Sequence, residues 1–439
     1  MVDNGFLRLH EVRIPRTNML MRFAQVDRDG NFSKPPHDKI GYGTMVYVRS
    51  TIIGGAGKYL AYVITIAIRY SIVRRQFPPN SNPKGAEVQI IDYLTQQHKL
   101  FPYLAATYVM HFAGLQVMRM YHDNLKRISQ GDMSQMAELH AVTAGLKSLT
   151  TEISIEGIEI ARKSLGGHGF SKFSGVIDVL VDWIPSQTYE GENTVLYLQV
   201  ASHIVKLMFG RKSQSLAPSS GFSYLFSQND SKISPESTSK DFNQLGFLLS
   251  CFQHRSRFVI ESVCAEFSSI MKSGKTFEET YNDLAVDLVR MAKCHSLYVL
   301  LAEFMKAIEQ ISDQQIRGMM ADLFSMFACF MMERDAGDFL EDGFLSSAQI
   351  QLCRRTGRRL LRKIRPQALV LVDAWDFPDY LLNSALGAHD GHVYENLYKW
   401  AKKSPLNESD VADGVKQYLL PLMKKGQEKC GIQGIRARL

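Results

Sequence analysis

Between residues 43 and 210 the sequence interrupts a helical pattern in only three places. The interruptions are the proline-containing stretch 78–85, the glycine-centred turn 130–132 and the glycine pair 166–167. The intervals between them carry apolar residues at helical spacing and are much longer than ordinary strands. They predict three long helices, at 44–77, 86–129 and 133–165, and a fourth at 195–209 after a loop at 166–186. Long helices with short connections favour an antiparallel bundle.

The rest of the chain divides around a polar segment. Residues 211–240 are rich in serine, proline and other polar residues, which is typical of a surface linker. Residues 241–430 return to helical periodicity and predict a second helical domain. Residues 1–40 read as extended chain and turns, too short to fold alone. We therefore predict an all-α fold of two helical-bundle domains, at 41–210 and 241–430, with a short segment in front and a tail at 431–439.

The composition supports a large core and argues against two classes of partner. Of the 439 residues, 45% are hydrophobic and 22% are charged, which is the balance of a globular protein. The net charge of +7 is too small for a dedicated nucleic-acid binder. The basic run 354–365 lacks the interleaved aromatic residues of a nucleic-acid site and fits the exposed face of an amphipathic helix. The charge-free run 59–68 is too short to cross a bilayer, so we expect no membrane span.

The cysteine pattern indicates reduced thiols rather than a metal centre. The six cysteines form no C-x-x-C pair and have no metal-ligand partners at useful spacing. His389-Asp390-Gly391-His392 has metal-capable atoms but is better explained as an Asp-Gly turn. The first five residues lack the basic and apolar regions of a secretory signal. We therefore predict an intracellular protein without a bound metal.

Two acidic residues flank a glycine at the start of the fourth helix, in the segment Tyr189-Glu190-Gly191-Glu192-Asn193. One interpretation is structural, because acids at this place favour the positive end of the helix dipole. The other is catalytic: Gly191 gives Glu190 room to swing toward a substrate, and a partly apolar pocket with Tyr189 would raise the carboxyl pKa toward the range of a general base. The residues by themselves favour the structural interpretation.

Two further segments have both a structural and a ligand-binding interpretation. Gly166 and Gly167 follow the third helix and fit either a helix C-cap or a close approach of the backbone to a ligand; the cap is the commoner case. Arg74 and Gln76 close the first helix. An arginine there either complements the terminal carbonyls or grips a pyrophosphate with Gln76 as its neighbour.

Taken together, these segments resemble the peroxisomal acyl-CoA oxidases of the acyl-CoA dehydrogenase superfamily. The resemblance runs from Val2 to about Asn407, and several of its motifs are specific to the oxidases. It rests on Val2-Asp3-Asn4-Gly5, Arg13-Ile14-Pro15-Arg16, Asn18-Met19-Leu20, Tyr42-Gly43-Thr44-Met45-Val46, Ile68-Arg69-Tyr70-Ser71, Arg74-Arg75-Gln76, Gly166-Gly167-His168-Gly169, Tyr189-Glu190-Gly191-Glu192-Asn193 and Leu371-Val372-Asp373-Ala374-Trp375-Asp376.

The resemblance implies FAD-dependent oxidation of a fatty acyl-CoA to the trans-2-enoyl-CoA, with O2 reduced to hydrogen peroxide. It places the catalytic base on Glu190 and puts Arg49 and Tyr189 near the acyl-CoA. A homodimer is implied as well, because the family shares each FAD across two subunits. The residues matched to FAD-binding positions are Arg74, Gln76 and Phe77 for the pyrophosphate of the neighbouring subunit, and Gln89, Gly166 and Gly167 for the adenosine part.

The resemblance also has consequences for the two ends of the sequence. Full members carry an N-terminal helical domain and a β-barrel domain before this point, so residues 1–40 match a remnant of the barrel. The final tripeptide Ala437-Arg438-Leu439 is similar to the Ser-Lys-Leu address and implies import into the peroxisome by its receptor. The rival interpretation is a truncated, non-catalytic helical homologue that dimerises with itself or with a full-length oxidase.

Overall fold

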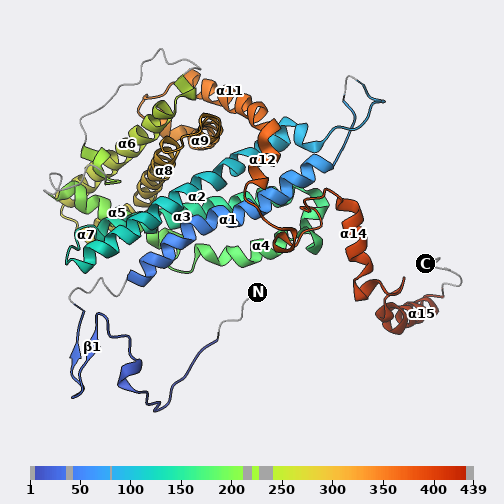
Figure 1. Ribbon diagram of the computed structural model, residues 1–439, viewed down its shortest axis with the longest axis horizontal. Coiled ribbons are helices and arrows are strands. Elements are labelled where there is room, and N and C mark those ends of the chain that lie inside the picture. Colours follow the sequence, from blue (N-terminus) through green and yellow to red (C-terminus); the bar gives the residue numbers. More distant parts are fainter. Residues whose placement is uncertain (1–4, 36–42, 80–81, 211–219, 227–240, 432–439) are drawn as a thin grey trace.

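The computed structural model describes residues 5–35, 43–79, 82–210, 220–226 and 241–431, and in these ranges the protein is built almost entirely of helices (Figure 1). The strands described there are β1 (Gln25–Val26) and β2 (Phe32–Ser33), which pair antiparallel in a small hairpin ahead of the helical body. The predicted all-α class with a short β segment in front is therefore confirmed.

The four predicted long helices of the first half are present. They are α1 (Gly43–Val73), α2 (Leu94–Ser129), α3 (Met136–Ser164) and α5 (Asn193–Phe209). Helix α1 packs against both α2 and α3, and α3 packs against α5. The first two helices are shorter than expected, because residues 74–77 and 88–90 leave the helices and pair with each other: Gln76 N donates to Val88 O at 3.0 Å and Ile90 N to Arg74 O at 2.9 Å.

The second half is also helical. Its larger helices are α6 (Leu245–Lys272), α8 (Ala285–Glu309), α9 (Gln314–Arg334) and α11 (Ser347–Ile364). The shorter helices are α7 (Phe277–Asp283), α10 (Ala336–Leu340), α12 (Ala368–Asp373), α13 (Asp379–Leu382), α14 (Val393–Lys402) and α15 (Leu420–Lys429). A π-helical turn at Val415–Leu419 precedes α15. The basic run lies on the exposed face of α11, as its amphipathic pattern predicted.

The predicted loop at 166–186 contains an additional helix, so that expectation was wrong in part. Helix α4 (Val176–Trp183) begins after Gly175, whose φ of +73° turns the chain into the helix. Short 3-10 turns at Gly166–Phe170, Lys172–Ser174 and Ile184–Gln187 surround it. The segment escaped prediction because its helix is only two turns long and is rich in β-branched residues, which have weak helix propensity.

One continuous hydrophobic core joins the two halves. A single cluster of buried residues extends from Ile52 in α1 to Val393 in α14. Helix α8 packs against α2, α3 and α5, and the ring of Phe304 in α8 stacks on Phe112 in α2 with centroids 5.7 Å apart. Within the predicted linker, the described residues 220–226 are also part of this core, since Phe222 is fully buried and stacks on His295.

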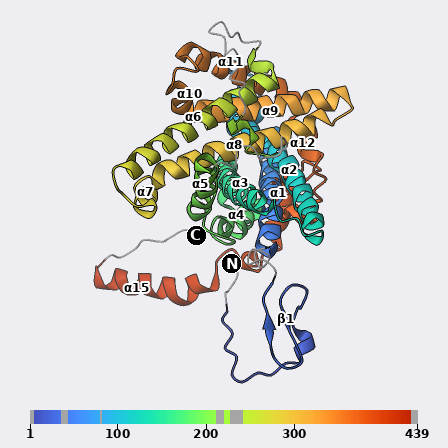
Figure 2. The same ribbon diagram turned by 90° about the vertical axis from the view of Figure 1, so that its left-hand side faces the viewer.

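Helix α1 crosses α2 at a point where both helices carry glycine. A Cβ atom built on Gly114 would meet Cα of Gly54 at 2.6 Å, so the two backbones touch. Among the described helices α1 is the one long and apolar enough to span a membrane, and 67% of its most apolar stretch is buried inside the protein. Its apolar composition is accounted for by its central position in the helical core (Figure 2).

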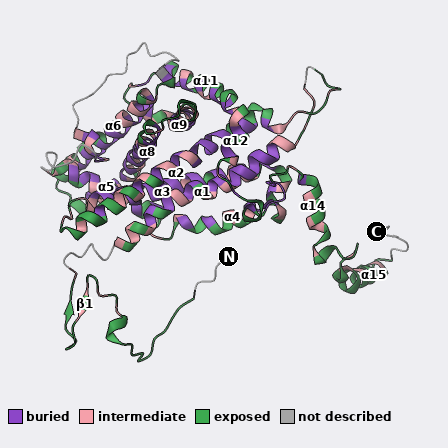
Figure 3. Cartoon of the chain, viewed as in Figure 1, coloured by how far each residue is buried: buried purple, intermediate pink, exposed green. Residues whose placement is uncertain are grey.

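The ends of the described chain are far more exposed than the helical body (Figure 3). Residues 5–35 are exposed almost throughout, with Phe6 97% and Leu20 94% accessible. Helix α15 stands away from the body and contains no buried residue. Most of the predicted linker, at 211–219 and 227–240, and the tail at 432–439 with its Ala437-Arg438-Leu439 tripeptide lie outside the described residues.

Candidate active site

Glu190 lies in a tight loop between α4 and α5, and its backbone has an unusual conformation. Its φ is +56°, and the next residue, Gly191, has a φ of +111°. L-amino acids rarely occupy this region, and such residues concentrate at functional sites. Gly191 cannot be replaced freely, because a Cβ atom there would meet Cδ2 of Leu196 at 2.6 Å.

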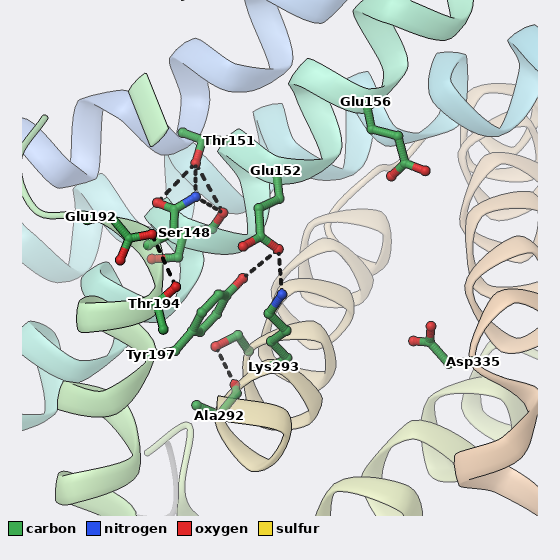
Figure 4. Close-up of polar contacts among 12 residues, drawn as sticks. Ser148, Thr151, Glu152, Glu156, Glu192, Thr194, Tyr197, Ala292, Lys293 and Asp335 are labelled. Atoms are coloured by element: carbon green, nitrogen blue, oxygen red, sulfur yellow. Dashed lines mark hydrogen bonds and ion pairs between the residues drawn. The ribbon is translucent and has the colours of Figure 1, made fainter. Parts of the chain in front are cut away.

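The two acidic residues of the loop differ in what their carboxylates contact. The Glu192 side chain caps α5, accepting hydrogen bonds from Val195 N and Thr194 Oγ1, each at 3.1 Å. Figure 4 shows the bond from Thr194. Partial desolvation opposes these bonds, but together they lower the pKa of Glu192. The half-buried Glu190 carboxylate makes no hydrogen bond or ion pair with any residue that the structure describes. The structural interpretation therefore fits Glu192, and Glu190 keeps a free carboxylate.

Arg49 holds the backbone of Glu190. It lies in the second turn of α1, is 2% exposed, and donates a hydrogen bond from Nε to the Glu190 carbonyl at 2.9 Å. Burial lowers the pKa of Arg49, an effect that the negative charge of Glu190 opposes. Its Nη1 atom is buried without a hydrogen-bond partner among the described residues. The structure thus brings together Arg49 and Glu190, which are 141 positions apart in sequence.

Lys147 holds the next carbonyl of the loop, and sequence reasoning missed it. It lies in α3 with no exposed surface, and its Nζ donates to the Gly191 carbonyl at 2.8 Å and to Asn193 Oδ1 at 3.0 Å. The Asn193 amide in turn donates to Ser148 O and Thr151 Oγ1 of the same helix. The one signal for this residue in the sequence is a lysine among small and apolar residues at 141–149.

Tyr189 precedes Glu190 in the loop and is 41% exposed. Burial raises the pKa of Tyr189 above its usual value, and the nearby Tyr59, Asp182 and Glu190 raise it further, so the hydroxyl stays neutral. The ring of Tyr59 stacks on Trp183 with centroids 4.2 Å apart, and this stack fixes the end of α4 against α1.

A largely apolar cavity of about 690 Å³ opens beside the N-terminal end of α1. Val46 and Tyr47 of α1, Leu125 of α2 and Leu139 of α3 line it, with Phe23 of the N-terminal segment. Val46 is one helical turn from Arg49, so the cavity and the Glu190 loop surround the same end of the helix.

The start of α5 is tied to the rest of the molecule by a charged cluster, shown in Figure 4. Lys293 Nζ of α8 lies 3.0 Å from Glu152 Oε2 of α3, and the Tyr197 hydroxyl of α5 donates to the same oxygen at 3.3 Å. Tyr197 is completely buried, which raises its pKa well above the usual value and keeps it a donor. The cluster connects three helices directly behind the loop.

The residues matched to FAD-binding positions lie at the other end of α1. Arg74 donates from Nη2 to Gln76 Oε1 at 2.7 Å and from Nη1 to the Tyr394 hydroxyl at 3.0 Å. Both acceptors are uncharged, so the guanidinium charge stays available for an anion. Gln89 is held nearby, because it accepts a hydrogen bond from Arg365 Nη2 at 2.9 Å and residue 89 pairs with residue 75.

Phe77 and the glycine pair present open surfaces at this end. Phe77 has a φ of +58° and is 65% exposed. Gly166 has a φ of +62°, and Cβ atoms on Gly166 or Gly167 would meet nothing within 4 Å. The glycines therefore leave free space beside the backbone that a flat or extended ligand can approach, and the uncharged partners of Arg74 suit a pyrophosphate.

The two groups of residues lie far apart within one chain. Arg49 and Arg74 are separated by 25 positions along one helical path, which at 1.5 Å per residue is about 37 Å. Figure 1 shows α1 as one continuous helix between its two ends. The structure therefore brings Arg49, Tyr189 and Glu190 together, and Arg74, Gln76, Phe77 and Gln89 together, but not the two groups with each other.

The described residues contain no group of three or more His, Cys, Asp or Glu side chains placed to hold a metal ion. The Asp390 side chain accepts from His392 N at 2.9 Å, and Gly391 has a φ of +73°, so this segment forms a turn. All six cysteines are free thiols, five of them buried.

Two family models match the chain. The model described as "Acyl-CoA oxidase, C-alpha1 domain" matches residues 42–205, and the model described as "Acyl-CoA oxidase" matches residues 244–424. Together they cover both helical halves. Peroxisomal acyl-coenzyme A oxidase 1 of Rattus norvegicus is 41% identical over 430 residues, covering 97% of this chain and 64% of that protein. The homologue of the same name from Phascolarctos cinereus is 40% identical over 429 residues with the same coverage. The chain thus spans about 64% of the length of these relatives.

Solved structures of similar proteins have the same helical arrangement. Acyl-CoA oxidase-2 of Caenorhabditis elegans, bound with FAD, ascaroside-CoA and ATP, matches with a TM-score of 0.88 and 40% identity, covering 95% of this chain and 62% of that one. Acyl-CoA oxidase 1 of Arabidopsis thaliana matches with a TM-score of 0.87 and 36% identity, covering 94% and 62%.

Proposed function

This chain belongs to the acyl-CoA oxidase family, and on that premise we propose that it takes part in the FAD-dependent oxidation of fatty acyl-CoA to trans-2-enoyl-CoA, with O2 reduced to hydrogen peroxide. The relatives named above are peroxisomal oxidases, and one neighbour of known structure holds FAD and an acyl-CoA derivative. The rival interpretation, a non-catalytic homologue, is not favoured, because the relatives at about 40% identity are named as oxidases.

One observation carries the proposal: the backbone of Glu190 is clamped while its carboxylate is free. A general base needs an unpaired carboxylate in a fixed position, because proton transfer depends on geometry before it depends on pKa. Glu192 does not meet this requirement, since its oxygens cap α5. The geometry therefore supports Glu190 as the base and Glu192 as a structural residue.

In the proposed reaction Glu190 accepts the α-proton of the acyl-CoA, which the thioester carbonyl acidifies. Arg49 keeps the Glu190 backbone in its left-handed conformation, and Tyr189 is a neutral, partly apolar neighbour in sequence. The apolar cavity beside Val46 is suited to the hydrocarbon part of the substrate. When bound, FAD supplies the acceptor for the two electrons of the β-hydride.

We assign the cofactor-binding role to Arg74, Gln76, Phe77, Gln89, Gly166 and Gly167. Among the described residues no carboxylate lies at hydrogen-bond distance from the Arg74 guanidinium, so its charge can bind an anion, and the glycines leave space for the adenosine part. Because Arg74 lies about 37 Å along α1 from Arg49, the residue that binds Glu190, we propose that Arg74, Gln76 and Phe77 hold the FAD of a second subunit rather than that of their own chain. The proposed active form is therefore a dimer.

We also propose a peroxisomal location. The names of the relatives and the final Ala437-Arg438-Leu439 tripeptide support it, since a small-basic-leucine ending is read by the peroxisomal import receptor. A reaction that releases hydrogen peroxide also benefits from confinement in one compartment.

The test of the proposed function compares the purified chain with its Glu190→Gln variant. The wild-type chain with FAD and an acyl-CoA should release hydrogen peroxide, and Glu190→Gln should lower this rate about 100-fold or more, because general-base catalysis typically contributes that much. Flavin binding should be unchanged, since Glu190 is remote from Arg74.

Glu192→Gln is the matched control. It alters the other acid of the loop and should keep the rate within a few-fold of wild type, at the cost of a weaker helix cap of about 1 kcal/mol. A variant Glu190→Gln that releases peroxide at the wild-type rate would reject Glu190 as the base. A wild-type chain that releases none in the presence of FAD would reject the proposed activity for this chain.

A further inference from the structure

Lys147 is a buried cation that contacts the loop at residues 188–193, called the base loop from here on. Its side chain has no exposed surface, and its ammonium group donates to one main-chain carbonyl and one amide oxygen of the segment 191–193. No carboxylate of the described residues lies within ion-pair distance of this ammonium group. The hydrogen bonds of the Lys147 ammonium group to described residues therefore go to Gly191 and Asn193 of the loop.

Burying an ammonium group without an ion-pair partner is costly, so its placement needs a reason. Burial lowers the pKa of Lys147 to about 8, and the nearby charge of Arg49 adds to this effect, while Glu192, Glu190 and Glu152 oppose it. An apolar side chain of similar length would fill the same space between the helices without this cost. An apolar side chain could not donate the hydrogen bond that the Lys147 ammonium group gives to the Gly191 carbonyl.

Arg49 and Lys147 hold two consecutive carbonyls of a strained backbone. Arg49 from α1 binds the carbonyl of Glu190 at 2.9 Å, and Lys147 from α3 binds that of Gly191 at 2.8 Å. Glu190 and Gly191, whose carbonyls are bound, have φ values of +56° and +111°. Fixing both carbonyls fixes the orientation of the two peptide planes that flank Gly191. The first of these planes is bonded to Cα of Glu190, so its orientation helps to set the direction in which the Glu190 side chain leaves the backbone.

We propose that Lys147 is a positioning residue for the base: its ammonium group, with the guanidinium of Arg49, clamps the loop so that the Glu190 carboxylate is presented to the substrate. The inference rests on the proposed function for its catalytic meaning, but not for its structural content. Lys147 does not touch the reacting atoms. It acts through the carbonyl of Gly191 and the side chain of Asn193.

The test replaces Lys147 by methionine, which keeps the length of the side chain and removes its charge and its donors. Lys306→Met is the matched control, because Lys306 is also a helical lysine, but its hydrogen-bond partner is Glu303 of its own helix α8 and not the loop. Hydrogen exchange of the peptide 188–193 is measured first, on the chain alone. Exchange there should become about 10-fold faster in Lys147→Met, because the two hydrogen bonds from Lys147 are lost, and should stay unchanged in Lys306→Met.

The kinetic arm uses the chain with FAD and acyl-CoA. In Lys147→Met, kcat should fall about 10- to 100-fold with KM nearly unchanged, because the base is present but misplaced. If wild type shows no oxidation, the proposed function fails, and the exchange result still decides the role of Lys147. Wild-type protection of the loop in a folded Lys147→Met protein, or an unchanged kcat, overturns the proposal. Should Lys147→Met not fold, Lys147→Gln, which retains a neutral donor, is measured in the same way with the same expected directions.

Discussion

At the scale of single residues, Gly191 decides whether the base loop can form. Its φ of +111° and the 2.6 Å approach of a Cβ atom to Leu196 both exclude an ordinary side chain. We expect Gly191→Ala to lower the free energy of unfolding by about 1–3 kcal/mol, through backbone strain and overpacking. Urea denaturation measures the change, and the rate of peroxide release should fall with it.

The control for this substitution is Gly318→Ala. Gly318 lies on the exposed face of α9, where a Cβ atom would meet nothing within 4 Å. Alanine there should raise the free energy of unfolding by up to about 1 kcal/mol, because alanine has the higher helix propensity. An equal effect of the two substitutions would show that the loop conformation at Gly191 carries no strain.

The family resemblance could place the base on Glu190, but the residues by themselves could not tell a helix-capping acid from a free one. The cap geometry, in which Glu192 accepts a hydrogen bond from Val195 N, makes this distinction. The role of Lys147 could not be predicted from its apolar surroundings in sequence, since its partner Gly191 is 44 positions away. Long-range contacts of this kind leave no local pattern in the chain.

At the scale of elements, the crossing of α1 and α2 depends on a pair of glycines that are not equivalent. A Cβ atom on Gly114 would lie 2.6 Å from Cα of Gly54, whereas one on Gly54 would lie 3.9 Å from Cα of Gly114. Gly114→Ala should therefore push the helices apart and cost about 1–3 kcal/mol of stability, while Gly54→Ala should be tolerated.

Thermal unfolding followed by circular dichroism distinguishes the two variants. We expect a clearly lower melting temperature for Gly114→Ala and a value near wild type for Gly54→Ala. Equal melting temperatures would mean that the helices adjust freely at the crossing. The wild-type geometry matters for function because the same helix, α1, carries Arg49 and lines the apolar cavity.

Periodicity predicted the long helices well because each of them buries one face over many turns. It failed at the short elements. Helix α4 is held by its contacts with α1 and α3 rather than by its own propensity. Residues 86–89 are extended because residues 88 and 89 pair with residues 74–77, and a 3-10 turn at Ile90–Asp92 precedes α2. In both places tertiary contacts decide the local structure, and no single-sequence pattern contains them.

At the scale of the whole molecule, the continuous core implies that the two predicted domains unfold together. Phe304 of α8 is fully buried against Phe112 of α2. We expect Phe304→Ala to cost about 3–5 kcal/mol and to speed hydrogen exchange in α3 of the first half as well as in α8.

Leu406→Ala is a suitable control, because Leu406 is 84% exposed and lies outside the core. It should change neither stability nor exchange. If Phe304→Ala accelerated exchange in the second half alone, the halves would be independent units, as the sequence predicted. A single transition with matching calorimetric and van 't Hoff enthalpies would support one cooperative unit.

The position of Arg49 and Arg74 at opposite ends of α1 predicts how two inactive alleles behave when one cell carries both. If each dimer site joins Glu190 of one chain to Arg74 of the other, a Glu190→Gln allele and an Arg74→Ala allele damage different halves of each site. Alone, each allele should give little activity, but in a mixed dimer one site combines the intact Glu190 with the intact Arg74. Co-expressed in equal amounts, two inactive alleles should restore roughly a quarter of the wild-type rate, since half of the dimers are mixed and each has one working site. Peroxide release from a cell that carries both alleles would therefore show that Glu190 and Arg74 serve one site from two different chains, as their separation along α1 requires.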